Sequence, residues 1–262
     1  MQSDHPPRVP RRVTVIGDSI AAGYGLPPAY AWPHLLIKQL AEAHPQFDWR
    51  LHNASIPGAA TPDAYARFDA IRQSQPHLAL IALGINDCRR AHSPVVARRI
   101  ERFRRNEQTW WGKNPVLRRV GNRLSPLDAS QPASPALSQV PLAIFLAILS
   151  WMVQQIQTLN AQPAILTMSP LTPELSRSPD FAACPRYNAA IREVARETGA
   201  ALIEIGTSAP PRTWLPDGIH LSARGQEQLA RRVLLSIHRP PIAPRLNLET
   251  PASNAQLAPS LD

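Results

Sequence analysis

Apolar residues along this chain gather in short runs, and the runs alternate with stretches in which apolar positions recur every three or four residues. The short runs are rich in β-branched and aliphatic residues and predict buried strands over residues 13–16, 49–54, 78–83, 164–168 and 200–205. The stretches of helical spacing predict helices over residues 27–44, from 61 onward, and over 142–159, 185–198 and 223–238. This alternation is typical of a doubly wound, three-layer α/β/α domain with a parallel sheet.

The alternation breaks after the third predicted strand. Residues 89–140 are first Arg-rich and then Pro/Ser-rich, and they far exceed an ordinary loop between a strand and a helix. The chain's 29 prolines also collect at its two ends. We therefore expect one α/β domain over residues 13–239 that carries an Arg/Pro-rich insert at 89–140. Residues 1–12 are expected to form an N-terminal tail and residues 240–262 a loosely held, Pro-rich C-terminal tail.

The basic charge belongs to one segment of the chain. The 262 residues have a net charge of +9, and residues 89–123 hold eleven Arg or Lys against two Glu, which accounts for the whole +9. With its tryptophan pair at 110–111, this segment is expected to be a lid or a docking surface for an anionic partner, such as phospholipid headgroups, an acidic glycan or an acyl-carrier protein. The alternative is a solvated Arg-rich helix followed by a disordered linker. Nucleic acid is not expected, because no nucleic-acid-binding motif is present.

The apolar runs of the chain bear on its expected cell compartment. The longest apolar run, residues 140–153, is shorter than the roughly 20 residues of a membrane-spanning helix. Residues 1–12 contain no apolar signal-peptide core, so the expectation is a cytoplasmic protein, with peripheral membrane association left open.

The chain has two cysteines, and Cys88 and Cys184 are too few for a disulfide-rich scaffold or a four-cysteine zinc site. Two separate thiols are favoured over a disulfide between them, which also stays open.

Polar residues and glycines follow the predicted strands at the points where those strands end. The first strand stops at Gly17-Asp18-Ser19, and later strands lead to Gly58, to Gly84-Ile85-Asn86-Asp87 and, after a longer loop, to Asp217 and His220. Right-handed crossovers place the carboxyl ends of parallel strands on one edge of the sheet. These positions are therefore expected to converge there, where open α/β folds bind ligands.

The residue types at this edge suit acyl transfer. Such chemistry needs a nucleophile, a base and a group that orients the base, and Ser19, His220 and Asp217 supply these. It also needs donors for the developing oxyanion, for which the candidates are the N–H groups of Ser19 and Gly58 and the side-chain amide of Asn86. Asp18 and Asp87 are expected to brace the loops. No cluster of His, Cys or Asp has the spacing of a metal site, so neither metal nor cofactor is expected.

The same four blocks, in the same order, resemble those of the SGNH (GDSL-type) hydrolases. The resemblance covers about residues 13–88 and 141–238 and leaves out the insert. It implies a flavodoxin-like, five-stranded parallel sheet and hydrolysis of esters or thioesters. It also implies a catalytic triad of Ser19, Asp217 and His220 and an oxyanion hole of Ser19, Gly58 and Asn86. The stretch from Gly17 to Tyr24 is most similar to the acyl thioesterase/lysophospholipase-like branch.

These observations predict a serine esterase or thioesterase that works through an acyl-Ser19 intermediate. An O-acyltransferase that passes the acyl group to a sugar or metabolite hydroxyl would use the same residues and differ only in excluding water. A third reading, of a different class, is a non-catalytic module that binds a polyanion through the Arg/Trp insert.

Overall fold

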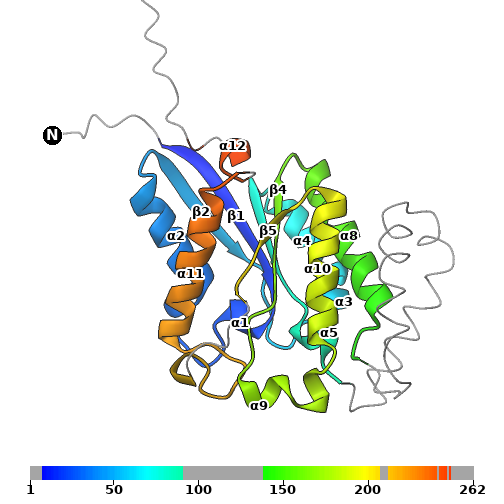
Figure 1. Ribbon diagram of the computed structural model, residues 1–262. Coiled ribbons are helices and arrows are strands. Elements are labelled where there is room, and N and C mark those ends of the chain that lie inside the picture. Colours follow the sequence, from blue (N-terminus) through cyan, green and yellow to red (C-terminus); the bar gives the residue numbers. More distant parts are fainter. Residues whose placement is uncertain (1–7, 91–137, 207–211, 241, 247, 249–262) are drawn as a thin grey trace, which may run out of the picture.

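A computed structural model of the chain shows one parallel sheet between two layers of helices (Figure 1), and it describes residues 8–90, 138–206, 212–240, 242–246 and 248. The strand order is β2-β1-β3-β4-β5, and every neighbouring pair is parallel. The strands are β1 (Val9–Gly17), β2 (Phe47–Asn53), β3 (Leu78–Ala82), β4 (Gln162–Leu166) and β5 (Ala201–Ile203). The predicted five-stranded parallel α/β/α fold is confirmed. β1 begins at Val9, so residues 9–12, which were expected in the N-terminal tail, belong to the sheet.

The central strands of the sheet are buried because helices cover both of its faces. In the register of the strands, Val15 of β1 lies beside Leu80 of β3, and Ile81 of β3 lies beside Ile165 of β4. All four side chains are almost completely buried. Strands covered on both faces are uniformly apolar rather than alternating, which is why β3 reads as one continuous apolar run in the sequence.

The helices divide into two layers that sandwich the sheet. Helices α2 (Trp32–Ala43) and α11 (Ala223–Ile237) pack together over one face, while α8 (Leu142–Thr158) and α10 (Cys184–Thr198) pack together over the other (Figure 1). The predicted helix over 27–44 is divided into a 3-10 turn, η1 (Pro28–Tyr30), and α2. The helix predicted from residue 61 is likewise divided, into α3 (Thr61–Ala66) and α4 (Phe68–Gln73).

Two glycines allow the strands to end in tight turns at the carboxyl edge. At Gly17 a Cβ atom would stand 2.5 Å from Ala21 Cβ, so a side chain would push β1 away from α1 (Ser19–Ala22). Gly84 follows β3 with a φ of 134°, and a Cβ there would lie 2.9 Å from Met168 Sδ. Only glycine meets both the conformation and the space at this second turn. It leads directly into the short helix α5 (Ile85–Cys88).

The two ends of the predicted insert meet beside α5. Gln139 N–H donates to Arg89 O at 2.7 Å, and Val140 N–H donates to Asp87 O at 3.1 Å. Arg90 and Ser138 form an antiparallel bridge. The insert therefore leaves and rejoins the domain at one place, whereas residues 91–137 lie outside the described part of the chain.

The apolar helix α8 is a core element. Ten of its 17 residues are buried, among them Phe145 and Ile148, which have no exposed surface. A helix that is apolar on most sides fits a position packed on several sides, here against β4, α3 and α10. Among the described residues, no helix is both long and apolar enough to cross a membrane.

The expected C-terminal tail is packed at its beginning, which corrects the sequence-based boundary. Residues 242–246 form α12 (Ile242–Leu246), and Ile242 and Leu246 are 2% and 3% exposed. The helix contacts β4 and α11 at the end of the sheet opposite α1 and α5 (Figure 1). Proline-rich composition suggests an irregular chain, but two apolar side chains one helical turn apart give this segment a face to bury.

We expect Ile242→Ala to lower the free energy of unfolding by about 2–4 kcal/mol, because it removes buried methyl groups and leaves a cavity. Leu235→Ala is the matched control, since Leu235 of α11 is 52% exposed and its truncation should cost about 0.5 kcal/mol or less. Urea denaturation measures both. Equal stabilities for the two variants would contradict the packing of α12.

Candidate active site

Three side chains from opposite ends of the chain form a continuous hydrogen-bonded row. His220 Nε2 lies 2.9 Å from Ser19 Oγ, and His220 Nδ1 lies 2.6 Å from Asp217 Oδ2. Asp217 Oδ1 accepts the backbone N–H groups of Ile219 at 3.0 Å and His220 at 2.7 Å. The structure thus brings together the three residues that the sequence analysis proposed as nucleophile, base and orienting acid.

The Asp217 carboxylate determines how this row can move a proton. A carboxylate only accepts, so the Nδ1 of His220 carries the hydrogen and the Nε2 is left to accept from the Ser19 hydroxyl. Partial burial raises the pKa of Asp217, but the hydrogen bonds from the His220 ring and from the Ile219 and His220 backbone outweigh this effect. The net pKa is below its usual value, which keeps the carboxyl ionised.

Ser19 is the first residue of α1, at the point where β1 ends. Asp18 caps this helix, since its Oδ1 accepts from Ile20 N–H at 2.9 Å. Burial raises the pKa of Asp18 to about 6, although the hydrogen bond from Ile20 and the charge of His220 act in the opposite direction. Ser19 itself is only 8% exposed. The loop-bracing role expected for Asp18 therefore takes the form of a helix cap directly beneath the serine.

The two other proposed oxyanion donors lie on neighbouring loops that are joined to each other. Ile56 N–H donates to Gly17 O at 3.1 Å, which places the turn at Gly58 beside the end of β1. Gly58 has a φ of 77°, a conformation that favours glycine, and a Cβ atom there would meet nothing within 4 Å. One N–H of the Asn86 amide donates to Ala59 O at 3.0 Å, and the amide retains a second N–H.

Asp87 connects the same two loops from below. Its Oδ1 accepts both the backbone N–H and the hydroxyl of Thr61, at 2.9 and 2.6 Å. Its Oδ2 is buried and has no hydrogen-bond partner among the described residues. Burial raises the pKa of Asp87 to about 7 despite the hydrogen bonds from Thr61, and the nearby charge of Asp18 raises it further.

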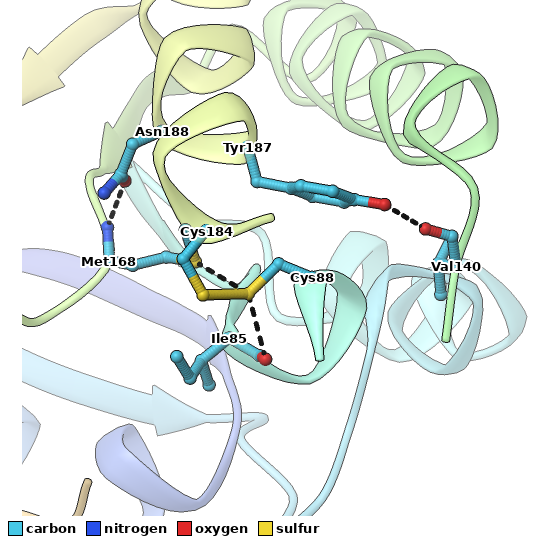
Figure 2. The surroundings of a disulfide bond; sticks show 7 residues. All are labelled: Ile85, Cys88, Val140, Met168, Cys184, Tyr187 and Asn188. Atoms are coloured by element: carbon cyan, nitrogen blue, oxygen red, sulfur yellow. Dashed lines mark hydrogen bonds between the residues drawn. A yellow bond between two sulfur atoms is a disulfide. The ribbon is translucent and has the colours of Figure 1, made fainter. Parts of the chain in front are cut away.

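Cys88 and Cys184 form a disulfide, which corrects the expectation of two separate thiols. The bond joins the last residue of α5 to the first residue of α10, with the two Cα atoms 5.3 Å apart (Figure 2). Next to it, the Tyr187 hydroxyl donates to Val140 O, and Met168 N–H donates to Asn188 Oδ1 at 2.9 Å. The disulfide therefore ties the segment that carries Asn86 to the helix layer on one face of the sheet.

A cavity of about 380 Å³ opens on the α10 side of α5. One of its walls is Ile85 of α5, and none of the five proposed site residues is part of its lining. The remaining lining is mainly apolar, with a few polar groups: Met168, Ser169, Pro170, Leu171, Ser176, Phe181, Cys184, Pro185, Asn188, Arg192 and Gly206. A mainly apolar lining suits a compact apolar group.

Two residues near the row were not identified from the sequence. The Tyr24 ring packs against the His220 ring, with centroids 4.6 Å apart, and is 57% exposed. Gln226 of α11 is 1% exposed and hydrogen-bonds to both α1 and α2. A signal for Gln226 does exist: it occupies the buried stripe that continues through Leu229, Ala230 and Val233, where a polar residue needs a partner.

Two expectations about binding concern metals and the basic segment. Among the described residues, no group of three or more His, Cys, Asp or Glu is placed to hold a metal ion. The basic docking surface expected over 89–123 lies outside the described residues, apart from Arg89 and Arg90. Both of these arginines are exposed, and the Arg89 guanidinium lies 5.8 Å from the centre of the Phe181 ring.

The disulfide yields a stability prediction. Because Cys88 and Cys184 are 96 positions apart, reduction should lower the free energy of unfolding by about 2–4 kcal/mol. Thermal denaturation with and without a dithiol reductant measures the effect, and the Cys88→Ser/Cys184→Ser variant is the control that should not respond to reductant. Two reactive thiols in the folded, air-oxidised protein would contradict the pairing.

The buried carboxyl of Asp87 yields a pH prediction. Since its pKa rises from 3.8 in the unfolded chain to about 7 in the fold, the folded state holds its proton more tightly. The stability contribution is full below pH 3.8 and is lost as pH rises through about 7, up to about 4 kcal/mol. Asp87→Asn should flatten the pH dependence of stability in this range. Asp69→Asn, which removes a carboxylate with 86% exposure, should leave that dependence unchanged.

Comparisons with known proteins concern the family to which the chain belongs. A family model described as the GDSL-like Lipase/Acylhydrolase family matches residues 15–228. The esterase TesA of Pseudomonas aeruginosa is 41% identical over 82 residues, which are 31% of this chain and 40% of that protein. Thioesterase 1/protease 1/lysophospholipase L1 of Escherichia coli is 37% identical over 81 residues, which are 30% of this chain and 36% of that protein. The matched segment thus spans well under half of either curated relative.

The likeness in fold extends much further along the chain. A crystal structure of TesA superposes with a TM-score of 0.57 at 24% identity, and the alignment covers 87% of this chain and 98% of that one. The family model itself spans the domain from β1 into α11 and includes Ser19, Gly58, Asn86, Asp217 and His220. The chain therefore belongs to the GDSL-like lipase/acylhydrolase family.

Proposed function

We propose that this protein hydrolyses carboxylic esters or thioesters through an acyl-enzyme intermediate on Ser19. The observation that carries the proposal is the hydrogen-bonded row from Ser19 through His220 to Asp217 at the carboxyl edge of the sheet. A serine hydroxyl is a weak nucleophile until a base accepts its proton, and a base held in one tautomer by a carboxylate does this efficiently.

In the acylation step, Ser19 Oγ attacks the carbonyl carbon of the substrate while its proton passes to His220 Nε2. Asp217 stabilises the imidazolium that forms and keeps its proton on Nδ1. The carbonyl π electrons move to the oxygen, which becomes an oxyanion. When the C–O or C–S bond breaks, His220 returns the proton to the departing alcohol or thiol, and the acyl group remains on Ser19.

The oxyanion needs donors that are already in position. We assign this role to the N–H groups of Ser19 and Gly58 and to the second N–H of the Asn86 amide. The support comes from the links between their loops, since Ile56 is bonded to Gly17 and Asn86 to Ala59. Each preorganised donor of this kind is worth about 3–4 kcal/mol in the transition state.

Deacylation repeats the sequence with water in place of the serine. Water gives a proton to His220 Nε2 and attacks the acyl carbon, and the Ser19–acyl bond then breaks as His220 returns the proton to Ser19 Oγ. The products are a carboxylic acid and the regenerated enzyme. An acyltransferase would differ only in the acceptor, an alcohol replacing water.

The cavity beside α5 supports a small or medium acyl group as the substrate part bound by the enzyme. The names of the two relatives, esterase TesA and thioesterase 1/protease 1/lysophospholipase L1, favour ester or thioester substrates. The basic segment 89–123 begins in the sequence directly after α5. We therefore also propose that it brings an anionic carrier of the acyl group, such as a phospholipid, an acidic glycan or an acyl-carrier protein, to the site.

The test is hydrolysis of p-nitrophenyl esters from acetyl to dodecanoyl, and of the matching acyl thioesters. Ser19→Ala should lower kcat by a factor on the order of 10⁴ or more, because it removes the nucleophile and leaves only binding and the oxyanion donors. Its thermal midpoint should stay close to that of the wild type.

Ser236→Ala is the matched control, since the Ser236 hydroxyl donates to Arg232 O of its own helix, near the C-terminal end of α11, and the variant should retain full activity. Turnover that survives in Ser19→Ala would overturn the assignment. Acyl transfer to an added sugar without hydrolysis would support the transferase instead. If folded wild-type protein catalyses neither reaction, the result would support the non-catalytic, polyanion-binding module.

A further inference from the structure

Gln226 connects the segment that carries the serine to the segment that carries the histidine. It lies in the first turns of α11, six positions after His220, and is 1% exposed. Its Nε2 donates to Ile20 O at 2.9 Å, and its Oε1 accepts from Trp32 N–H at 2.9 Å. The side chain therefore spans from α11 to α1 and to the start of α2.

The orientation of this amide is fixed by its partners. A backbone N–H can only donate and a carbonyl oxygen can only accept, so Oε1 must face Trp32 and Nε2 must face Ile20. In α2 the N-cap residue Ala31 makes no side-chain capping bond, and Gln226 supplies the acceptor that the first N–H of this helix needs. Both ends of the amide are used, which is what a buried polar group requires.

On the serine side, the hydrogen bond from Gln226 to Ile20 O stabilises α1, which is too short to be stable alone. α1 has four residues, and one turn of helix has little stability of its own. Besides the backbone bonds from Gly23 N–H to Ile20 O and from Tyr24 N–H to Ser19 O, two side chains hold its Ser19–Ile20 region. Asp18 accepts the Ile20 N–H, and Gln226 donates to the Ile20 carbonyl. Ile20 follows the serine directly, so a shift of Ile20 would shift Ser19.

On the histidine side, α11 is joined to the loop that ends in His220. Ser222, two positions after the histidine, caps α11 by accepting from Gly225 N–H at 3.3 Å. Its own N–H donates to Trp214 O at 2.8 Å, and its carbonyl accepts from Gln226 N–H at 2.9 Å. Gln226 is therefore rigidly connected to the segment on which the base stands.

We infer that Gln226 is a positioning residue that sets the distance between Ser19 Oγ and His220 Nε2, an inference that rests on the proposed function. It touches neither the substrate nor the reacting atoms and acts through Ile20. Proton transfer between the two side chains depends on their separation. A displacement of about 1 Å at a reacting group costs on the order of 10²-fold in rate. Loss of the amide should therefore lower kcat more than it changes KM.

The experiment compares Gln226→Met with Gln162→Met. Gln162 is also a buried glutamine that joins two elements, since it begins β4 and accepts from Arg245 of α12 at 3.2 Å, but it lies at the end of the sheet opposite the site. Well below both thermal midpoints, Gln226→Met should lose about 10- to 100-fold in kcat with little change in KM. Gln162→Met should lose stability and keep its kcat.

A second variant separates positioning from a general loss of packing. In Gln226→Glu, the protonated side chain can still donate to Ile20 O and accept from Trp32 N–H, whereas the ionised form cannot donate. Burial of this position favours the protonated form. The kcat ratio of this variant to wild type should therefore rise as pH falls from about 8 to about 6, because groups present in both proteins cancel in the ratio.

Three results would overturn this inference, and they differ in what they mean for the proposed function. Wild-type turnover with a kcat of Gln226→Met within about twofold of wild type would overturn this inference and leave the proposed function standing. Equal losses of kcat in Gln226→Met and Gln162→Met would also overturn it, because they would show a general effect of stability. Absence of turnover in the wild type would remove the proposed function and this inference with it.

Discussion

The hydrogen bond between His220 and Ser19 joins side chains 201 positions apart in the sequence, and the proposed chemistry depends on this 2.9 Å contact. Neither residue is on a long rigid element. Ser19 begins a helix of four residues, and His220 stands in the loop before α11. Their separation is therefore set by the structure that surrounds them, and much of the domain can be understood from this requirement.

The sheet provides the first part of that support. Because all five strands are parallel, their carboxyl ends lie on one edge, and β1 and β3 deliver Ser19 and Asn86 from neighbouring positions. Local bonds provide the second part. Asp18 caps α1, Asp87 and Asn86 join α5 to the loop that carries Gly58, and the disulfide anchors α5 to α10. Burying two carboxyl groups here disfavours their charged forms, and the raised pKa values of Asp18 and Asp87 express that cost.

Much of this could be predicted from the sequence, for physical reasons that differ from one part to another. Buried parallel strands are uniformly apolar, so runs such as residues 78–83 are visible without an alignment. The order of polar blocks after those strands determines which residues share an edge, and this placed Ser19 with His220. The family resemblance then supplied roles for these residues, which remain proposals.

Other features depend on contacts between distant segments, or are marked only by a short local pattern that the composition of the segment obscures. The pairing of Cys88 with Cys184 requires that α5 and the start of α10 approach to 5.3 Å between Cα atoms, which follows from packing and not from cysteine spacing. Residues 242–246 were expected to be part of a loose tail because of the prolines around them, although two apolar side chains of this segment are buried in α12. Gln226 was missed because its importance lies in its partners, Ile20 and Trp32, from a distant part of the chain.

The measurement that tests the central claim most directly is the rate at which a fluorophosphonate labels the protein, with the modified peptide identified by mass spectrometry. Activation of Ser19 by His220 predicts one adduct, on the peptide that contains Ser19. It also predicts that labelling of a folded His220→Gln variant is slower by at least about 10²-fold. An adduct on a different residue, or equal labelling rates for the two proteins, would contradict the account.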